Sequence, residues 1–240
     1  MNYNWNWSIF WQEAADGSGT YMDLLLRGLS MTLATAAVAC LIALAFGFAI
    51  GIARTLPGRA AGWLSGFWVE YFRNIPLLVH LFLFFFVLPE LLPAAMGTWL
   101  KQMPNGPFVT AAIGIGLYMS ARVAVGVEAG IRSLPRGQAA AATAIGLTRW
   151  QSYRYILLPI ACRIMLPSLT NDMINTIKNT SVALTIGLIE LTAAARQMQE
   201  LSYQVFEALI AATLVYLLLN LLATWLATIV ERRLRIKGSR

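Results

Sequence analysis

The chain has 240 residues, of which 58% are hydrophobic and only 12% charged, and its mean hydropathy is +0.64. Soluble domains carry about 25% charged residues, and long apolar runs would cover such a domain with large apolar patches. The composition therefore excludes a soluble enzyme, a disordered protein and a disulfide scaffold, and it predicts an integral membrane protein. The net charge of +7 does not indicate nucleic-acid binding, because the basic residues are scattered at the ends of the apolar runs.

Five apolar runs predict five membrane-spanning helices, since a span needs about 20 apolar residues. The runs lack the alternation of a transmembrane barrel, and the fourth is broken by polar residues. They cover about 24–53, 67–92, 108–127, 156–188 and 206–230. Pro76 in the second run, and Pro159 and Pro167 in the fourth, predict kinks or half-helices. We expect an all-α transmembrane domain over 24–231, a short outer segment at 1–23 and a basic tail at 232–240.

The basic residues predict which way the chain crosses the membrane. Arginines follow the first run and lie between the third and fourth, and the C-terminus carries Arg232, Arg233, Arg235, Lys237 and Arg240. The opposite ends of the runs are mainly acidic. The positive-inside rule therefore puts the C-terminus in the cytoplasm and the N-terminus outside. Termini on opposite sides require an odd number of spans, which agrees with five.

The cytoplasmic segment at about 133–159 predicts two short helices joined at a glycine. Pro135 suits the first helical position, and the alanine run after it is a strong helix former. Gly146 stands where a left-handed cap would end the first helix, and Thr148 can N-cap the second. A plain surface loop with high helix propensity would have the same features, so the pattern alone leaves both interpretations open.

A wider set of motifs resembles a known family. Ala140-Ala141-Ala142, then Gly146, then Ile156-Leu157-Leu158-Pro159 after nine residues resemble the cytoplasmic coupling motif of ABC importer permeases. Residues 70–78, 133–138 and 178–181 resemble characteristic segments of the polar amino acid uptake permeases, with the glutamate/aspartate permeases looking nearest. The resemblance runs from about Leu24 to the C-terminus.

This resemblance implies the permease subunit of an ATP-driven importer in the bacterial inner membrane, which forms the path for polar, acidic amino acids. It implies ATPase coupling through Gly137, Gln138, Ala140, Ala141, Ala142 and Gly146. Alanine stands at position 140 where the motif has an acidic residue, so coupling there is expected to rest on shape and apolar contact.

The implied partners are a second permease chain (identical or paralogous), a cytoplasmic ATPase dimer, a periplasmic amino acid-binding protein and membrane lipid. The sequence has no G-x-x-x-x-G-K-[ST] phosphate loop. We therefore expect no cofactor in this chain, with ATP and Mg²⁺ bound by the ATPase, and no enzymatic activity of its own.

Ionisable residues within membrane spans are costly and mark functional sites or internal pairs. Arg122 lies in the middle of the third run, and its planar cation suits a substrate carboxylate. The rival interpretation is an internal pair with Asp172 that only holds helices together. The predicted path also includes Asn74, Lys178, Thr180 and Ser181.

The single histidine, His80, is interpreted as a hydrogen-bonded helix contact. It has no second histidine or thiol pair with which to form a metal site.

Other functions remain as alternatives. An ion-coupled secondary transporter of amino acids usually has internal repeats and more spans, and no repeat is found here. A membrane-embedded enzyme would need a nucleophile with a base, or a metal cluster, which the sequence lacks. A permease for a different polar amino acid is a further alternative.

Overall fold

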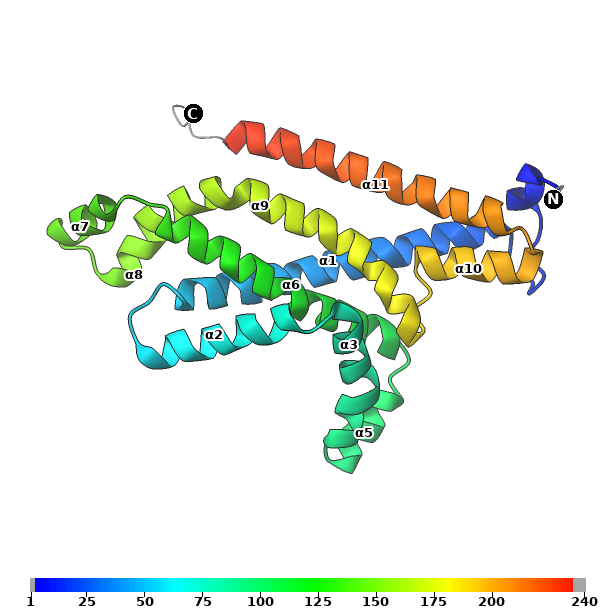
Figure 1. Cartoon of the computed structure of the whole chain (residues 1–240), viewed down its shortest axis with the longest axis horizontal. Coiled ribbons are helices and arrows are strands. Elements are labelled where there is room, and N and C mark those ends of the chain that lie inside the picture. Colours follow the sequence, from blue (N-terminus) through cyan, green and yellow to red (C-terminus); the bar gives the residue numbers. More distant parts are fainter. Residues whose placement is uncertain (1–2, 235–240) are drawn as a thin grey trace. The chain divides into compact units, whose positions relative to one another are not determined.

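The computed structural model describes residues 3–234 (Figure 1). Arg235, Lys237 and Arg240 of the predicted basic tail lie outside the described residues. The described part is helical apart from connections and one isolated bridge between Glu13 and Thr20. The elements are η1 (Trp7–Trp11), α1 (Tyr21–Ala53), α2 (Arg59–Asn74), α3 (Leu77–Phe82), η2 (Leu83–Val87), α4 (Leu88–Leu91), α5 (Ala94–Lys101), α6 (Gly106–Arg132), α7 (Arg136–Ala144), α8 (Arg149–Ser152), η3 (Tyr153–Leu157), α9 (Leu158–Asn179), η4 (Thr180–Ile186), α10 (Leu191–Ser202) and α11 (Val205–Leu234).

Three helices, α1, α6 and α11, are each long and apolar enough to cross a membrane. The stretch from α2 to α4 passes the same test only as a pair broken at Ile75–Pro76. Ile75 is extended, with φ −111° and ψ 132°, because the residue before a proline avoids helical geometry. The predicted half-helices around Pro76 are thereby confirmed. The described residues hold three or four candidate spans, and α9 is not among them.

Two π-helical turns each end two residues before a proline. The turn η2 precedes Pro89 and η3 precedes Pro159, and in them Leu88 and Leu158 donate to the carbonyls five residues back. Proline lacks an N–H and crowds the carbonyl four residues before it, and a π turn rearranges the hydrogen bonds at that point. The chain therefore stays helical from α8 to η4. The predicted second short helix is a continuation of α9 rather than a separate element.

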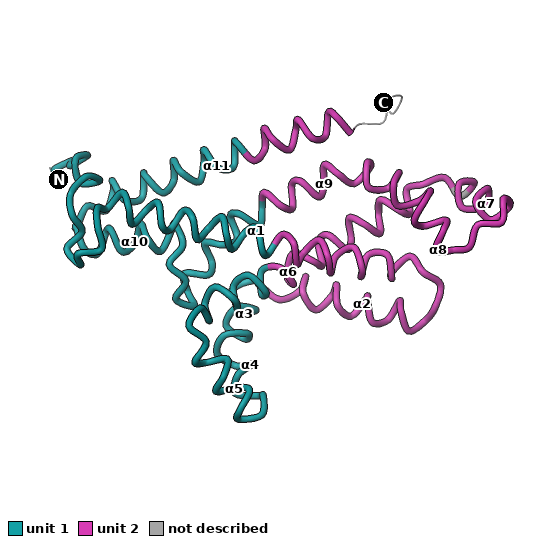
Figure 2. The backbone as a smooth tube through the Cα atoms, turned by 180° about the vertical axis from the view of Figure 1, so that it is seen from behind, with its two compact units in different colours: residues 1–39, 77–115, 175–222 teal, residues 40–76, 116–174, 223–240 magenta. Residues whose placement is uncertain are grey.

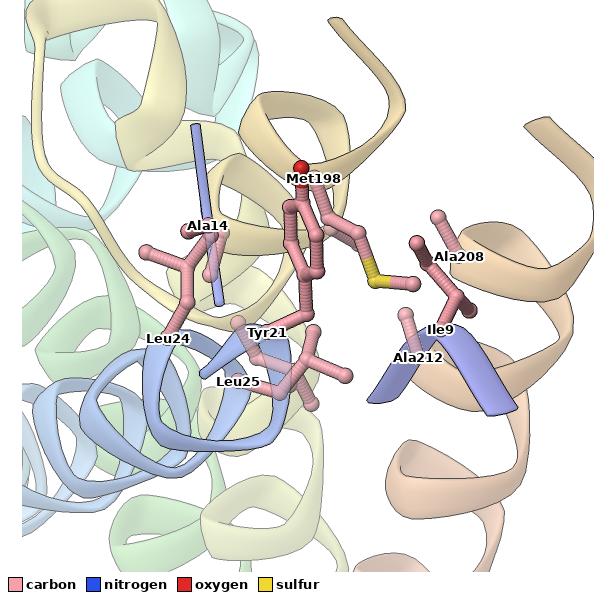
Figure 3. Packing of buried hydrophobic residues seen from close by; sticks show 11 residues of the cluster. Ile9, Ala14, Tyr21, Leu24, Leu25, Met198, Ala208 and Ala212 are labelled. Atoms are coloured by element: carbon pink, nitrogen blue, oxygen red, sulfur yellow. The ribbon is translucent and has the colours of Figure 1, made fainter. Parts of the chain in front are cut away.

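The chain divides into two compact units, shown in Figure 2. One comprises residues 1–39, 77–115 and 175–222, and the other comprises 40–76, 116–174 and 223–240. The first unit has an apolar cluster formed by the N-terminal segment, α10 and the first turns of α1 and α11 (Figure 3). Its members are Ile9, Ala14, Tyr21, Leu24, Leu25, Leu191, Ala194, Ala195, Met198, Ala208 and Ala212.

The second unit holds α1 and α6 in close contact at two glycines one turn apart. A Cβ at Gly47 would lie 2.4 Å from Val123 Cγ1, and one at Gly51 would lie 2.6 Å from Val127 Cβ. Small residues at this spacing let membrane helices approach closely. In the same unit the Trp68 indole of α2 donates to Ser120 Oγ of α6 at 3.0 Å. These contacts fix two helices, α1 and α2, against α6.

Two helices, α5 and α10, were not predicted. The residues of α10 that face inward, Leu191, Ala194, Ala195 and Met198, are three or four positions apart. Its first turn is capped by the Glu190 carboxylate, which accepts from the N–H groups of Thr192 and Ala193. The helix is amphipathic and too polar to stand out as an apolar run, so a search for apolar runs does not find it.

Candidate functional site

The predicted glycine junction closes α7 through a Schellman motif. Gly146 is left-handed, with φ +83°, and its N–H donates to the Thr143 carbonyl at 3.0 Å. The Leu147 N–H donates to the Ala142 carbonyl at 3.1 Å, which completes the motif. Only glycine adopts this backbone region without cost. The left-handed cap expected at Gly146 is confirmed.

Capping chemistry also begins α8 as predicted. The Gln151 N–H donates to Thr148 Oγ1, and the Thr148 N–H donates to Gln151 Oε1 at 2.8 Å. These two bonds form a capping box, which satisfies backbone donors that the first turn leaves open. Pro135 is the N-cap of α7 rather than its first helical residue, with ψ 133°. These local bonds fix both helix ends within residues 136–155, which we call the α7–α8 loop.

The exposed surface of this loop includes both small residues and large apolar ones. Gly137, Gln138, Ala140, Ala141 and Gly146 are exposed, but Ala142 is buried. Three large side chains were not predicted as part of this surface: Ile145, Trp150 and Tyr155 are exposed by 73%, 68% and 63%. The sequence signal that could have predicted these three residues is the presence of large apolar side chains in a stretch outside the membrane runs. The exposed residues at 137–141 are uncharged, whereas Arg149 and Arg154 of the same loop are also exposed.

Tyr153 attaches the loop to the end of α1, and a charged cluster joins the end of α1 to α6. The Tyr153 hydroxyl lies 3.0 Å from Thr55 Oγ1, just after α1. Arg54 pairs with Glu128 of α6, and Arg132 also pairs with Glu128 at 2.9 Å. The Glu128 side chain is only 15% exposed, so its charge depends on these two arginines. The pair of Arg54 with Glu128 could not be predicted from the sequence, because 74 residues separate the two.

Replacing Glu128 with alanine is expected to destabilise the protein by about 1–3 kcal/mol, between the values for exposed and fully buried pairs. Thermal unfolding in detergent measures the change. Glu200→Ala is the matched control: its pair with Arg196 is also i,i+4, but the side chains are 64% and 66% exposed. That variant should change stability by less than about 0.5 kcal/mol. Equal losses in both variants would contradict a special role for the Glu128 cluster.

Arg122 makes the contact that the rival interpretation anticipated. Its Nε donates to Asp172 Oδ1 of α9 at 2.9 Å. The Asp172 side chain is 6% exposed, whereas that of Arg122 is 51% exposed. The arginine therefore neutralises a buried carboxylate, while about half of its own side chain stays exposed. Five N–H donors allow it to hold Asp172 and a second carboxylate together.

The other predicted path residues lie in separate settings. Asn74 ends α2 and is exposed, and its amide donates to the carbonyl and the carboxylate of Glu70 at 2.8 and 2.9 Å. Lys178 is exposed in the last turn of α9, and its carbonyl accepts from Ser181 Oγ. Thr180 is buried and donates to the Ile177 carbonyl. Lys178, Thr180 and Ser181 thus come together at the junction of α9 with η4.

His80 is fully buried in α3, with its ring 6.2 Å from that of Phe84. Its setting is that of a packed helix contact. Among residues 3–234, no three side chains of metal-binding type gather in one place.

Comparison with known proteins identifies relatives of the whole chain. Residues 43–236 match the family model described as binding-protein-dependent transport system inner membrane component. The chain is 42% identical to the glutamate/aspartate import permease protein GltJ of Escherichia coli (strain K12), covering 100% of this chain and 98% of the relative. It is 31% identical to the arginine transport system permease protein ArtQ of Bacillus subtilis (strain 168), covering 89% and 94%.

Solved structures show the same fold. A chain from the crystal structure of an amino acid ABC transporter with histidines is 28% identical, with a TM-score of 0.76 and coverage of 89% of this chain and 95% of that one. A chain of the MetNI methionine ABC transporter in an inward-facing conformation has a TM-score of 0.71 at 20% identity, covering 90% and 98%.

Proposed function

We propose a function from one premise: the chain belongs to the family of binding-protein-dependent transport system inner membrane components. It is an importer permease, a transport subunit rather than an enzyme. We infer that it forms the path by which a bacterial inner-membrane importer takes up polar, acidic amino acids such as glutamate and aspartate. The observation that supports acidic amino acids as the substrate is the 42% identity to a glutamate/aspartate import permease over the full chain.

Five spans are the arrangement that fits this role. Three are α1, α6 and α11, the fourth is the broken stretch α2–α4, and we assign the fifth to α9. The charges of Arg163, Asp172 and Lys178 lower the apolarity of α9, as expected for a helix that faces protein or water rather than lipid. With the arginines of the α7–α8 loop in the cytoplasm, the N-terminus lies outside and the C-terminus inside.

We propose that the α7–α8 loop docks on a cytoplasmic ATPase dimer, which would bind ATP and Mg²⁺. Its exposed Ala140 and Ala141 and the apolar side chains of Ile145 and Trp150 support docking by shape and apolar contact. A second permease chain would enclose the path, and a periplasmic amino acid-binding protein would deliver the substrate. Membrane lipid covers the rest of the spans.

We assign Arg122, Asn74, Lys178, Thr180 and Ser181 to the proposed path. Arg122 is the residue that we expect to select acidic substrates, because about half of the Arg122 side chain is exposed beside the buried Asp172. An acidic amino acid carries two carboxylates, and an always-charged, planar fork suits such a group. The hydroxyls and amides would supply neutral hydrogen bonds.

Reconstitution tests this function. The permease, purified with its ATPase, is placed in liposomes with the binding protein, and uptake of labelled glutamate is followed. Uptake should require both ATP hydrolysis and the binding protein. Uptake that persists without the ATPase and follows an imposed ion gradient would instead identify a secondary transporter. Competition by other amino acids tests the substrate, and displacement by glutamine but not by aspartate would reject the acidic assignment.

A further inference from the structure

Residues 3–20 form a folded cap on the first unit. The short helix η1 is followed by a turn in which Ala14 N–H donates to the Gly19 carbonyl at 2.8 Å. Ile9 and Ala14 are buried in the cluster with Met198 of α10 and Ala208 of α11 (Figure 3). The segment therefore packs against the ends of three helices and is part of the unit's core.

A buried carboxylate holds this segment in place through hydrogen bonds. Glu207, in the first turn of α11, is fully buried. It accepts hydrogen bonds from the Asn6 backbone N–H at 2.7 Å and from the Tyr3 hydroxyl. A buried charge is tolerated only when it is hydrogen-bonded, and both of these donors come from the segment. Desolvation and the bond to Glu207 raise the pKa of Tyr3, so its hydroxyl keeps the proton that it donates.

The outer side of the cap is aromatic. Ring contacts connect Tyr3, Trp5, Trp7, Phe10 and Phe206, which we call the aromatic cap; Trp5 and Trp7 stack with ring centroids 5.6 Å apart. These rings are packed together, yet Trp5, Trp7 and Phe206 are 53%, 50% and 49% exposed. Half-exposed tryptophans fixed in one group form a surface rather than a core.

We propose that the aromatic cap is an interfacial anchor that sits among the lipid headgroups where α11 enters the bilayer. Trp and Tyr concentrate at this level of a membrane, because their rings are apolar at one end and polar at the other. Phe206 is in the first turn of α11, a helix apolar enough to span the membrane. Further along α11, Leu209 and Leu214 are exposed by 48% and 51%. This continuity identifies lipid as the partner, on whichever side the N-terminus lies.

Tryptophan quenching in proteoliposomes tests the anchor with the full chain. Emission of the parent protein minus that of Trp5→Phe/Trp7→Phe gives the signal of these two residues. We expect it to be blue-shifted, quenched by phospholipids brominated near the headgroup and largely insensitive to aqueous acrylamide. Quenching by acrylamide alone would overturn the proposal. So would lipid quenching that is lost on adding the binding protein, which would identify a protein-docking surface.

Two further variants test whether the hydrogen bond from Tyr3 to Glu207 holds the aromatic cap in place. Tyr3→Phe removes one donor to Glu207 and should reduce the headgroup quenching of Trp5 and Trp7. Tyr203→Phe is the control, since Tyr203 is 84% exposed near the same end of α11. It should leave the quenching unchanged. Equal effects of the two variants, with normal expression, would contradict the role of the Tyr3–Glu207 bond in holding the anchor.

Discussion

Replacing Gly146 with valine is expected to lower substrate-stimulated ATP hydrolysis of the assembled importer about tenfold, because left-handed strain of about 1–3 kcal/mol falls on a β-branched residue. A Cβ at this position meets no atom within 4 Å, so the defect is one of backbone conformation and not of a clash. Loss of the Schellman bonds would change the shape of the α7–α8 loop. Hydrolysis by the complex, with and without loaded binding protein, measures the effect.

Two variants serve as controls for the backbone effect at Gly146. Gly146→Asn should retain most of the stimulation, because asparagine tolerates the left-handed region. Gly62→Val, in α2, also adds side-chain atoms in open space, at a glycine whose φ is not left-handed, and should leave hydrolysis unchanged. Normal co-purification of the ATPase and normal stimulation in Gly146→Val would show that this loop is not the coupling element.

Removal of Arg122 is expected to abolish uptake of glutamate, but the pair with Asp172 makes the single variant ambiguous. Arg122→Gln leaves a carboxylate that is only 6% exposed without its cation. We expect a cost of about 1–3 kcal/mol, below the value for a fully buried pair because the Arg122 side chain is half exposed. This cost would lower assembly as well as transport.

The double variant Arg122→Gln/Asp172→Asn separates the two roles, since it removes the arginine and the buried charge together. It should regain normal expression and assembly and normal basal ATP hydrolysis, while glutamate uptake stays below about one-tenth of normal, a loss of at least about 1.4 kcal/mol of interaction with the substrate. Arg122→Lys should be intermediate, because an ammonium lacks the bidentate fork. Normal uptake by the double variant would restrict Arg122 to holding α6 and α9 together.

Local chemistry explains which features could be predicted from the sequence. The cap at Gly146 and the capping box at Thr148 each depend on bonds between residues three to five positions apart. The break at Pro76 follows from the proline and the residue before it. Long apolar runs similarly predict membrane helices without knowledge of their neighbours. These features need no tertiary contact.

The remaining features depend on which segments meet. Arg122 and Asp172 are 50 residues apart, and Glu207 finds its donors about 200 residues away at the N-terminus. The close approach of Gly47 to Val123, and the burial of Ala142 among exposed neighbours, likewise follow from packing. The sequence by itself determined the membrane class, the long apolar helices and the caps at Gly146 and Thr148, because these depend on hydropathy and short-range bonds. Only the tertiary structure decided how each charge is neutralised, because a buried charge is stabilised by whichever group the fold brings to it.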